Sequence, residues 1–267
     1  MILRPFYAVV ERELVRMFRQ RGRLVAAMVR PMIWLLVIGT GLDAMLGQGG
    51  TGSYRYFLVP GVVGMTMLFG AMIASLSTVY DKESGVMRML VVAPFPHHWI
   101  VIARTLGATA AASVQALMLL ALLALLGYVG ADANWGLLLP GLLATSLACA
   151  SLGMLVAAWS PTLENFAVIM NLVIFPVFFL SGALYPVQHL PDWLRWVASV
   201  NPFTYGVDLL KHASPASTAA QFAPDFSMAT DFAVLLVFCA AATVVASVRF
   251  SREAACEPLI HALTRGR

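Results

Sequence analysis

Six long apolar segments, separated by shorter polar connections, constrain the fold of this chain more than any other feature. A helix needs about 17–25 mostly apolar residues to cross a bilayer. The six segments cover residues 24–46, 57–79, 105–129, 137–159, 165–187 and 232–248. Lipid supplies no hydrogen-bond partners for the backbone, whereas a helix satisfies its own. The sequence therefore predicts an all-α integral membrane protein, with a single transmembrane domain of six helices over residues 1–267.

The composition agrees with this class. Hydrophobic residues make up 60% of the 267 residues and charged residues 11%, whereas an average soluble domain has about 45–50% apolar and about 25% charged residues. The first segment contains Arg30 and Asp43, near its two ends, where charged groups can reach the headgroups. The other five segments contain no Asp, Glu, Lys, Arg or His.

The distribution of basic residues predicts the orientation, because Lys and Arg are retained on the cytoplasmic side. One side of the predicted topology has 13 of them: Arg4, Arg12, Arg16, Arg19, Arg21, Arg23, Lys82, Arg88, Arg104, Arg249, Arg252, Arg265 and Arg267. The other side has Arg55, Arg195 and Lys211. Both termini, the connection 80–104 and the tail 249–267 are therefore predicted to be cytoplasmic.

Residues 1–23 have the periodicity of an amphipathic helix. One face carries the apolar side chains, and arginines are distributed around the other. The apolar face consists of Phe6, Val9, Val10, Leu14, Met17 and Phe18. This pattern predicts a helix on the inner membrane surface. A flexible basic leader that only fixes the topology is the alternative.

Several kinds of site are missing from the sequence. Spans two to six have no ionisable relay of the kind that ion-driven transporters use. The five histidines lie outside the spans, and the adjacent His97 and His98 project in different directions on a helix. We therefore expect no catalytic and no metal site. Neither Lys82 nor Lys211 follows glycine as a phosphate-binding loop requires, so any ATPase must be a partner.

The stretch "DKESGVMRML", residues 81–90, concentrates charge between two spans. It is interpreted as a short cytoplasmic helix, with Asp81 and Glu83 near its start, where the helix dipole favours anions. Pro94 and Pro96 end it before the chain returns to the membrane. Such a helix can be pushed by a soluble motor subunit. An ordinary solvated loop is the alternative.

Three stretches carry a resemblance that spans nearly the whole chain: "YRYFLVPGVVGMTML", "YDKESGVMRMLVVAPFPHHWIVIARTLG" and "FPVFFLSGALYPVQHLPDWLRWVASVNPFTYGVDLLK". Together they resemble the permease subunits of ATP-binding-cassette type-2 exporters, a group that includes nodulation-factor, drug and polysaccharide export permeases. The resemblance implies that residues 80–104 contain a coupling helix. Its predicted ATPase-coupling residues are Asp81, Lys82, Glu83, Gly85, Arg88 and Leu90.

Within that loop, Glu83 and Gly85 match the Glu-x-Gly of the family. Further matches in register are Leu90, Pro94, Arg104 and Gly107. Members often have an acidic residue near position 88, where this chain has Arg88. The pairing with the ATPase is therefore expected to differ in detail.

The segment 186–211, before the last span, is too apolar for a free loop. It predicts two short helices that dip into the outer leaflet and satisfy their own backbone. The resemblance implies that this re-entrant hairpin is an outer gate; a passive interfacial anchor is the alternative. The predicted gate residues are Pro186, Pro191, Trp193, Trp196, Asn201, Pro202 and Tyr205.

The resemblance also implies a dimer of permeases, identical or paralogous, with the pathway between them and two cytoplasmic ATPase subunits that bind ATP and Mg²⁺. The chain itself is expected to hold no cofactor and to bind no nucleic acid.

Candidate pathway residues are Met65, Met67, Phe69, Met72, Asn171, Phe175, Phe178 and Phe179. Their apolar character suits a lipid-like or amphipathic substrate better than an ion, and the resemblance implies that glycan or drug-type substrates are further candidates. The sequence thus predicts an exporter permease of a bacterial cytoplasmic membrane. An ion-driven secondary transporter and a non-transporting membrane scaffold are the alternatives.

Overall fold

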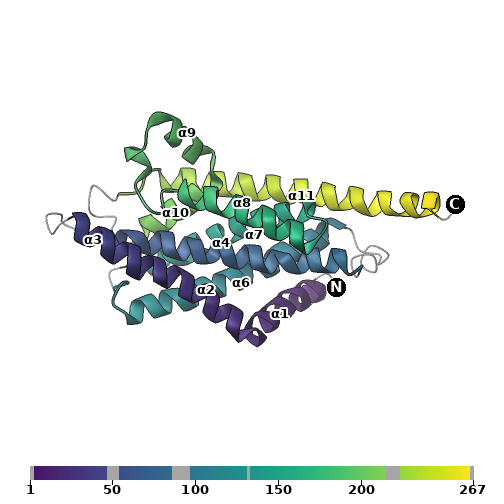
Figure 1. Cartoon of the computed structure of the whole chain (residues 1–267), viewed down its shortest axis with the longest axis horizontal. Helices are drawn as coiled ribbons and strands as arrows, with labels where there is room; N and C mark the ends of the chain where they lie inside the picture. Colours follow the sequence, from purple (N-terminus) through teal and green to yellow (C-terminus); the bar gives the residue numbers. More distant parts are fainter. Residues whose placement is uncertain (1–2, 47–53, 86–96, 131–132, 215–222, 265–267) are drawn as a thin grey trace.

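The computed structural model describes residues 3–46, 54–85, 97–130, 133–214 and 223–264, and every regular element in these ranges is helical. The longer helices run side by side in one bundle (Figure 1). In chain order the elements are α1 (Leu3–Arg19), α2 (Arg21–Ile33), the π-helical η1 (Trp34–Gly39), α3 (Thr40–Leu46), α4 (Tyr54–Glu83), α6 (His97–Leu125), α7 (Trp135–Trp159), α8 (Leu163–Phe179), the 3₁₀ turn η2 (Val187–His189), α9 (Asp192–Val200), α10 (Pro202–His212) and α11 (Met228–Thr264). We call the two ends of the bundle the Tyr54 end and the Glu83 end, after the first and last residues of α4.

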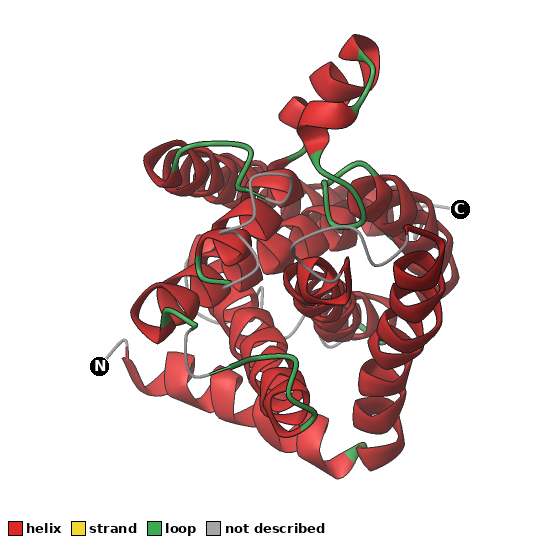
Figure 2. Ribbon diagram, turned by 90° about the vertical axis from the view of Figure 1, so that its left-hand side faces the viewer, coloured by secondary structure: helices red, strands yellow, loops and turns green. Residues whose placement is uncertain are grey.

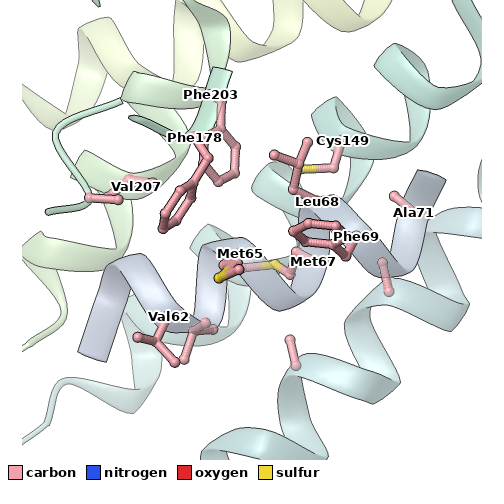
Figure 3. Packing of buried hydrophobic residues seen from close by; sticks show 14 of the residues in the cluster. Val62, Met65, Met67, Leu68, Phe69, Ala71, Cys149, Phe178, Phe203 and Val207 are labelled. Atoms are coloured by element: carbon pink, nitrogen blue, oxygen red, sulfur yellow. The ribbon is translucent and has the colours of Figure 1, made fainter. Parts of the chain in front are cut away.

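Helix α4 lies at the centre of the bundle. It packs against α2, α6, α7, α8 and α10. Of its apolar 18-residue stretch 89% is buried inside the protein, compared with 28% of the corresponding stretch in α11. A helix that is apolar all round belongs in the interior. Figure 3 shows Phe178 of α8 together with Phe203 and Val207 of α10 near the same stretch of α4.

Small residues allow α4 to approach its neighbours closely. A Cβ on Gly153 of α7 would lie 2.5 Å from Ser75 Oγ of α4 and 3.3 Å from the Ala71 carbonyl oxygen. A Cβ on Gly61 would lie 2.5 Å from the Ala183 carbonyl oxygen. Helices packed in lipid use small residues in this way because close backbone approach increases their van der Waals contact.

All six predicted spans fall on helices, but they differ in length. Within the described ranges, four helices are long and apolar enough to cross a membrane: Tyr54–Glu83, His98–Leu125, Trp135–Trp159 and Met228–Ser251. The predicted span 165–187 is too long, because helix α8 has 17 residues and ends at Phe179. At about 1.5 Å per residue, such a helix is shorter than the roughly 30 Å hydrocarbon core. The six-span count therefore stays a prediction.

The first predicted span, 24–46, consists of α2, η1 and α3 in succession. Pro31 lies inside α2, where it supplies no N–H to the helical ladder. The wider π-helical turn begins three residues later, at Trp34. The apolar helix in this region covers Ala27–Leu42.

The predicted pair of short helices before the last span is confirmed by α9 and α10. Asn201 separates them: its side chain accepts a hydrogen bond from Phe203 N at 3.1 Å, and Pro202 begins α10. Proline fits the first turn of a helix, where its missing N–H has no partner to lose. Helix α10 is buried at the Tyr54 end, whereas α9 stands away from the bundle (Figures 1 and 2).

Helix α1 packs mainly on α6. Met17 of its predicted apolar face is buried with Leu24 and Ala111. Phe18, from the same predicted face, is 52% exposed, whereas Glu13 is buried. The predicted helix is present, but its inward face includes a carboxylate.

Candidate functional site at the charged end of helix α4

Three consecutive charged residues, Asp81, Lys82 and Glu83, form the last turn of α4. These residues continue α4. The expectation that a separate helix over 81–90 begins at Asp81 is therefore wrong for residues 81–83. Two anions at a helix C-terminus are unfavourable for the helix dipole. Each of them therefore needs a partner from elsewhere in the fold.

Asp81 is compensated by two arginines. Its Oδ2 accepts hydrogen bonds from the guanidinium groups of Arg104 in α6 and of Arg12 in α1, the latter at 3.2 Å. The side chains of Asp81 and Arg104 are 9% and 5% exposed. Charge-assisted hydrogen bonds of this kind are stronger than neutral ones. Asp81 therefore fastens α4 to α6 and α1.

Glu13 adds a second connection between α1 and α4. Its Oε1 accepts a hydrogen bond from Ser77 Oγ at 3.0 Å, one turn before Asp81, and lies 3.7 Å from Arg12 Nη2. A buried carboxylate is tolerated only where such partners exist. This contact explains why Glu13 faces inward.

Lys82 points to the end of α7. Its Nζ donates to the carbonyl oxygens of Ala158 at 3.3 Å and Ala157 at 3.4 Å. A cation is favourable there because the last carbonyls of a helix have no partners within the helix. The same ammonium lies 5.1 Å from the ring centre of Phe250 in α11, a cation–π distance.

Glu83 binds the start of α8. Its Oε2 accepts a hydrogen bond from Leu163 N, the first residue of that helix, at 2.9 Å. A carboxylate at a helix N-terminus satisfies a free N–H and complements the dipole. The last turn of α4 is thus connected to α1, α6, α7, α8 and α11.

Gly85 follows in a turn with φ of +75°, and a Cβ there would meet no atom within 4 Å. The predicted coupling residues Arg88 and Leu90, and Pro94 and Pro96, lie outside the described residues. In the described residues before this gap, the side chains of Asp81, Lys82 and Glu83 all bind other helices of the same chain. The coupling assignment stays a prediction.

The pathway candidates on α4 lie in the core. Met65, Met67 and Met72 are buried, and Met67 Sδ accepts a hydrogen bond from Ser146 Oγ at 3.0 Å. Phe69 is covered by the guanidinium of Arg30, 4.4 Å from the ring centre. In this arrangement these four side chains pack the bundle and do not line an open surface.

The candidates on α8 divide between two faces. Phe178 is buried and makes an edge contact with Trp34, whereas Phe175 is 49% exposed. Phe179 and Asn171 are also exposed. The exposed apolar side chains follow helical spacing: Val168, Leu172, Phe175 and Phe179.

The predicted gate residues are distributed over η2, α9, α10 and the turns that connect them. Trp193 and Trp196 on α9 are 69% and 71% exposed, whereas Tyr205 on α10 is buried and donates to the Ser199 carbonyl at 2.7 Å. Asn201 Nδ2 donates to the Val177 carbonyl of α8 at 2.7 Å. The prolines Pro186, Pro191 and Pro202 lie before η2, before α9 and at the start of α10.

A polar cluster beside this hairpin was missed by sequence reasoning. It joins Asp208 and His212 of α10 to Asp231 in the first turn of α11. The i, i+4 spacing of Asp208 and His212 was the available signal. Asp231 directly precedes the predicted sixth span, 232–248, and nothing in the sequence around it indicates a partner.

Comparison with known proteins places the chain in a family. Residues 4–213 match the family described as "ABC-2 type transporter". The chain is 31% identical over 186 residues to nodulation protein J of Rhizobium leguminosarum bv. viciae, covering 68% of this chain and 70% of the relative. It is 26% identical over 218 residues to the putative transport permease ycf38 of Porphyra purpurea, covering 79% and 74%. The chain therefore belongs to the ABC-2 type transporter family and is a multi-pass membrane transport permease.

Proposed function

We propose that this permease is the membrane subunit of an exporter powered by a separate ABC ATPase. It moves an amphipathic substrate, such as a lipid-like, glycan or drug molecule, out across a bacterial cytoplasmic membrane. Family membership supports transport, and the relatives include a nodulation protein and a putative transport permease. The ATPase, the direction and the substrate class are the proposed elements.

One observation carries the ATPase proposal. The last turn of α4, which directly precedes the predicted coupling segment in the chain, carries a charged network that reaches α1, α6, α7, α8 and α11. Asp81 binds Arg104 and Arg12, and Glu83 binds the first N–H of α8. A force that a partner applies next to this turn would therefore act on several helices together, because the buried pair Asp81–Arg104 resists separation.

The substrate class is supported by a cavity of about 290 Å³ between α1, α4 and α6. Its walls combine Glu13, Arg16 and Gln115 with apolar residues such as Met17 and Ile73. Polar groups beside an apolar wall are typical of a site for an amphipathic molecule.

The exposed stripe of Val168, Leu172, Phe175 and Phe179 on α8 supports the proposal that a second permease copy completes the pathway.

The test uses two glycines with matched local geometry at opposite ends of the bundle. Gly85 and Gly127 have φ of +75° and +79°, and a Cβ on either meets no atom within 4 Å. Tryptophan at either position therefore carries the same left-handed strain, about 1–2 kcal/mol. Full-length permease is co-expressed with the candidate ATPase, and copurification and substrate-stimulated ATP hydrolysis are measured.

We expect Gly85→Trp to insert normally but to lose the ATPase, whereas Gly127→Trp retains it and stimulates hydrolysis at the native level. If both variants retain the ATPase and transport normally, docking at the Glu83 end is wrong. Transport driven by an ion gradient without any ATPase would instead support the secondary-transporter alternative. A permease that binds the ATPase and never responds to substrate would be a scaffold.

A further inference from the structure

A second cluster of charged side chains lies at the Tyr54 end, and the proposed coupling does not use it. Asp208 and His212 are one turn apart on α10, Asp231 is in the first turn of α11, and Asp225 and Phe226 precede α11. The side chains of Asp208 and Asp231 are both 0% exposed. The cluster therefore joins two helices across a buried contact.

Asp208 is held rigidly. Its Oδ1 accepts a hydrogen bond from Asp225 N and its Oδ2 one from Phe226 N, both at 2.8 Å. Lys211 Nζ lies 3.6 Å from Oδ1. A carboxylate has about four lone-pair positions, so two acceptor positions remain. Fixing a carboxylate in this way prepares it to act as a ligand.

Asp231 is buried without compensation. Neither of its carboxylate oxygens has a hydrogen-bond partner, although Oδ2 faces His212 Nε2 at 3.5 Å. An ionised carboxylate in this state costs several kcal/mol or more in a medium of low dielectric constant. The nearest positive charge that the described residues offer Asp231 is therefore His212, and only when it is protonated.

The charge balance of the cluster leads to the same conclusion. Asp208, Asp225 and Asp231 are three carboxylates, and the described cations in contact with them are Lys211 and, when protonated, His212. Lys211 is engaged mainly by Asp225, at 2.8 Å. Even with His212 protonated, one negative charge remains in excess.

The spacing of three side-chain ligand atoms suits a metal ion. One oxygen of each carboxylate and one His212 nitrogen lie within 4.8 Å of one another. His212 Nε2 is 3.5 Å from Asp231 Oδ2 and 4.0 Å from Asp208 Oδ2. Tetrahedral Zn²⁺ with bonds of about 2.0–2.1 Å separates its ligands by roughly 3.3–3.5 Å. His212 Nε2 also lies 3.1 Å from the Phe226 carbonyl oxygen, which accepts a hydrogen bond from it; a metal bound through Nε2 would replace this hydrogen bond.

We propose that Asp208, His212 and Asp231 bind a divalent transition-metal ion of the zinc type, which fastens α10 to the start of α11. Imidazole and carboxylate together favour such ions over Mg²⁺, which prefers oxygen ligands alone. Because α9 leads directly into α10, the metal fixes the base of the hairpin. The inference does not depend on the ATPase or on the transported substrate.

The test titrates the full-length permease with Co²⁺, a coloured substitute for Zn²⁺, after treatment with a chelator. The protein is purified in detergent without a histidine tag. We expect saturable visible absorption typical of a low-symmetry Co²⁺ site, loss of that absorption on addition of Zn²⁺, and a higher Tm with Zn²⁺ than with Mg²⁺. Asp231→Asn should weaken Co²⁺ binding by at least about tenfold. Losing a group that merely orients a metal ligand already lowers metal affinity by about 10–100-fold.

The matched controls are Asp192→Asn and His189→Gln, which change an exposed carboxylate and an exposed imidazole on the same hairpin. Both should bind Co²⁺ like the wild type. Equal binding by the wild type and Asp231→Asn would overturn the proposal. So would a wild-type protein whose Tm does not respond to Zn²⁺, a measurement that stands even if the variant fails to fold.

Discussion

At the scale of single residues, the charged turn at the end of α4 shows how burial changes the significance of an ion pair. Asp81 and Arg104 are almost fully buried, whereas the pair Asp192–Arg195, at 3.8 Å on α9, is exposed. Water screens the exposed pair, so its contribution to stability is small. Removing one member of the buried pair leaves an uncompensated charge.

The first prediction concerns Arg104. Arg104→Met should lower the free energy of unfolding by up to about 3–5 kcal/mol, because among the described residues Asp81 then keeps the half-exposed Arg12 alone as a charged partner. The double variant Arg104→Met/Asp81→Asn should recover much of this loss, since both charges are removed. Thermal unfolding in nanodiscs measures the effect.

Asp192→Asn, at the fully exposed carboxylate of the Asp192–Arg195 pair, is the control, and it should leave the Tm almost unchanged. A double variant that is less stable than Arg104→Met alone would show that the charge pair is not the source of the effect. Arg104 would then contribute through its packing.

At the scale of elements, the hairpin of α9 and α10 divides into a buried and an exposed half. Thr204 Oγ1 donates to the Ala198 carbonyl at 2.8 Å, and Tyr205 donates to Ser199, so α10 holds the end of α9. Trp193 and Trp196 do not take part in these bonds. Exposed tryptophans of this kind suit the membrane interface or a partner surface.

We expect Trp193→Ala/Trp196→Ala to keep the fold and the ATPase while altering transport or its coupling to hydrolysis. The reason is that both side chains are about 70% exposed and their loss creates no cavity. Transport into membrane vesicles and ATP hydrolysis are measured in parallel. Trp135→Ala, at a 44% exposed tryptophan elsewhere at the Tyr54 end, is the control. Normal transport by the double variant at normal expression would leave α9 as a passive anchor.

At the scale of the whole molecule, basic side chains gather at the Glu83 end of the bundle and buried carboxylates at the Tyr54 end. Arg12, Lys82 and Arg104 meet at the Glu83 end, whereas Lys211 lies with Asp208 and Asp225 at the Tyr54 end. Helix α1 and the far end of α11 both extend toward the Glu83 end (Figure 1). This arrangement fits the predicted orientation, with the Glu83 end in the cytoplasm.

Cysteine labelling tests that orientation. In a background without Cys149, Cys239 and Cys256, His189→Cys should react with an impermeant thiol reagent added to intact cells. Ser84→Cys and Ser251→Cys should react only after the membrane is permeabilised. All three positions are exposed in the structure, so accessibility within the protein is matched. Labelling of Ser84→Cys in intact cells would reverse the topology.

Much of the fold was predictable because lipid imposes simple rules on a sequence. The apolar runs identified helices at the correct places, and Asn201-Pro202 marked the junction of α9 and α10. The lengths were less accurate: the apolar run 165–187 continues past Phe179, where the helix ends. Gly182, with φ of +72°, lies in that continuation. Hydropathy does not detect such a change of backbone direction.

The sequence by itself determined that this is a helical membrane protein, where its helices lie and which family it belongs to. Only the tertiary structure decided that Asp81 meets Arg104, that Glu83 binds the start of α8, and that Asp231 meets Asp208 and His212. The physical reason is that helices such as α4 are apolar on all sides, so their periodicity does not specify which face meets which neighbour. Close packing of small residues fixes those faces, and the charged groups at the helix ends are brought together as a result.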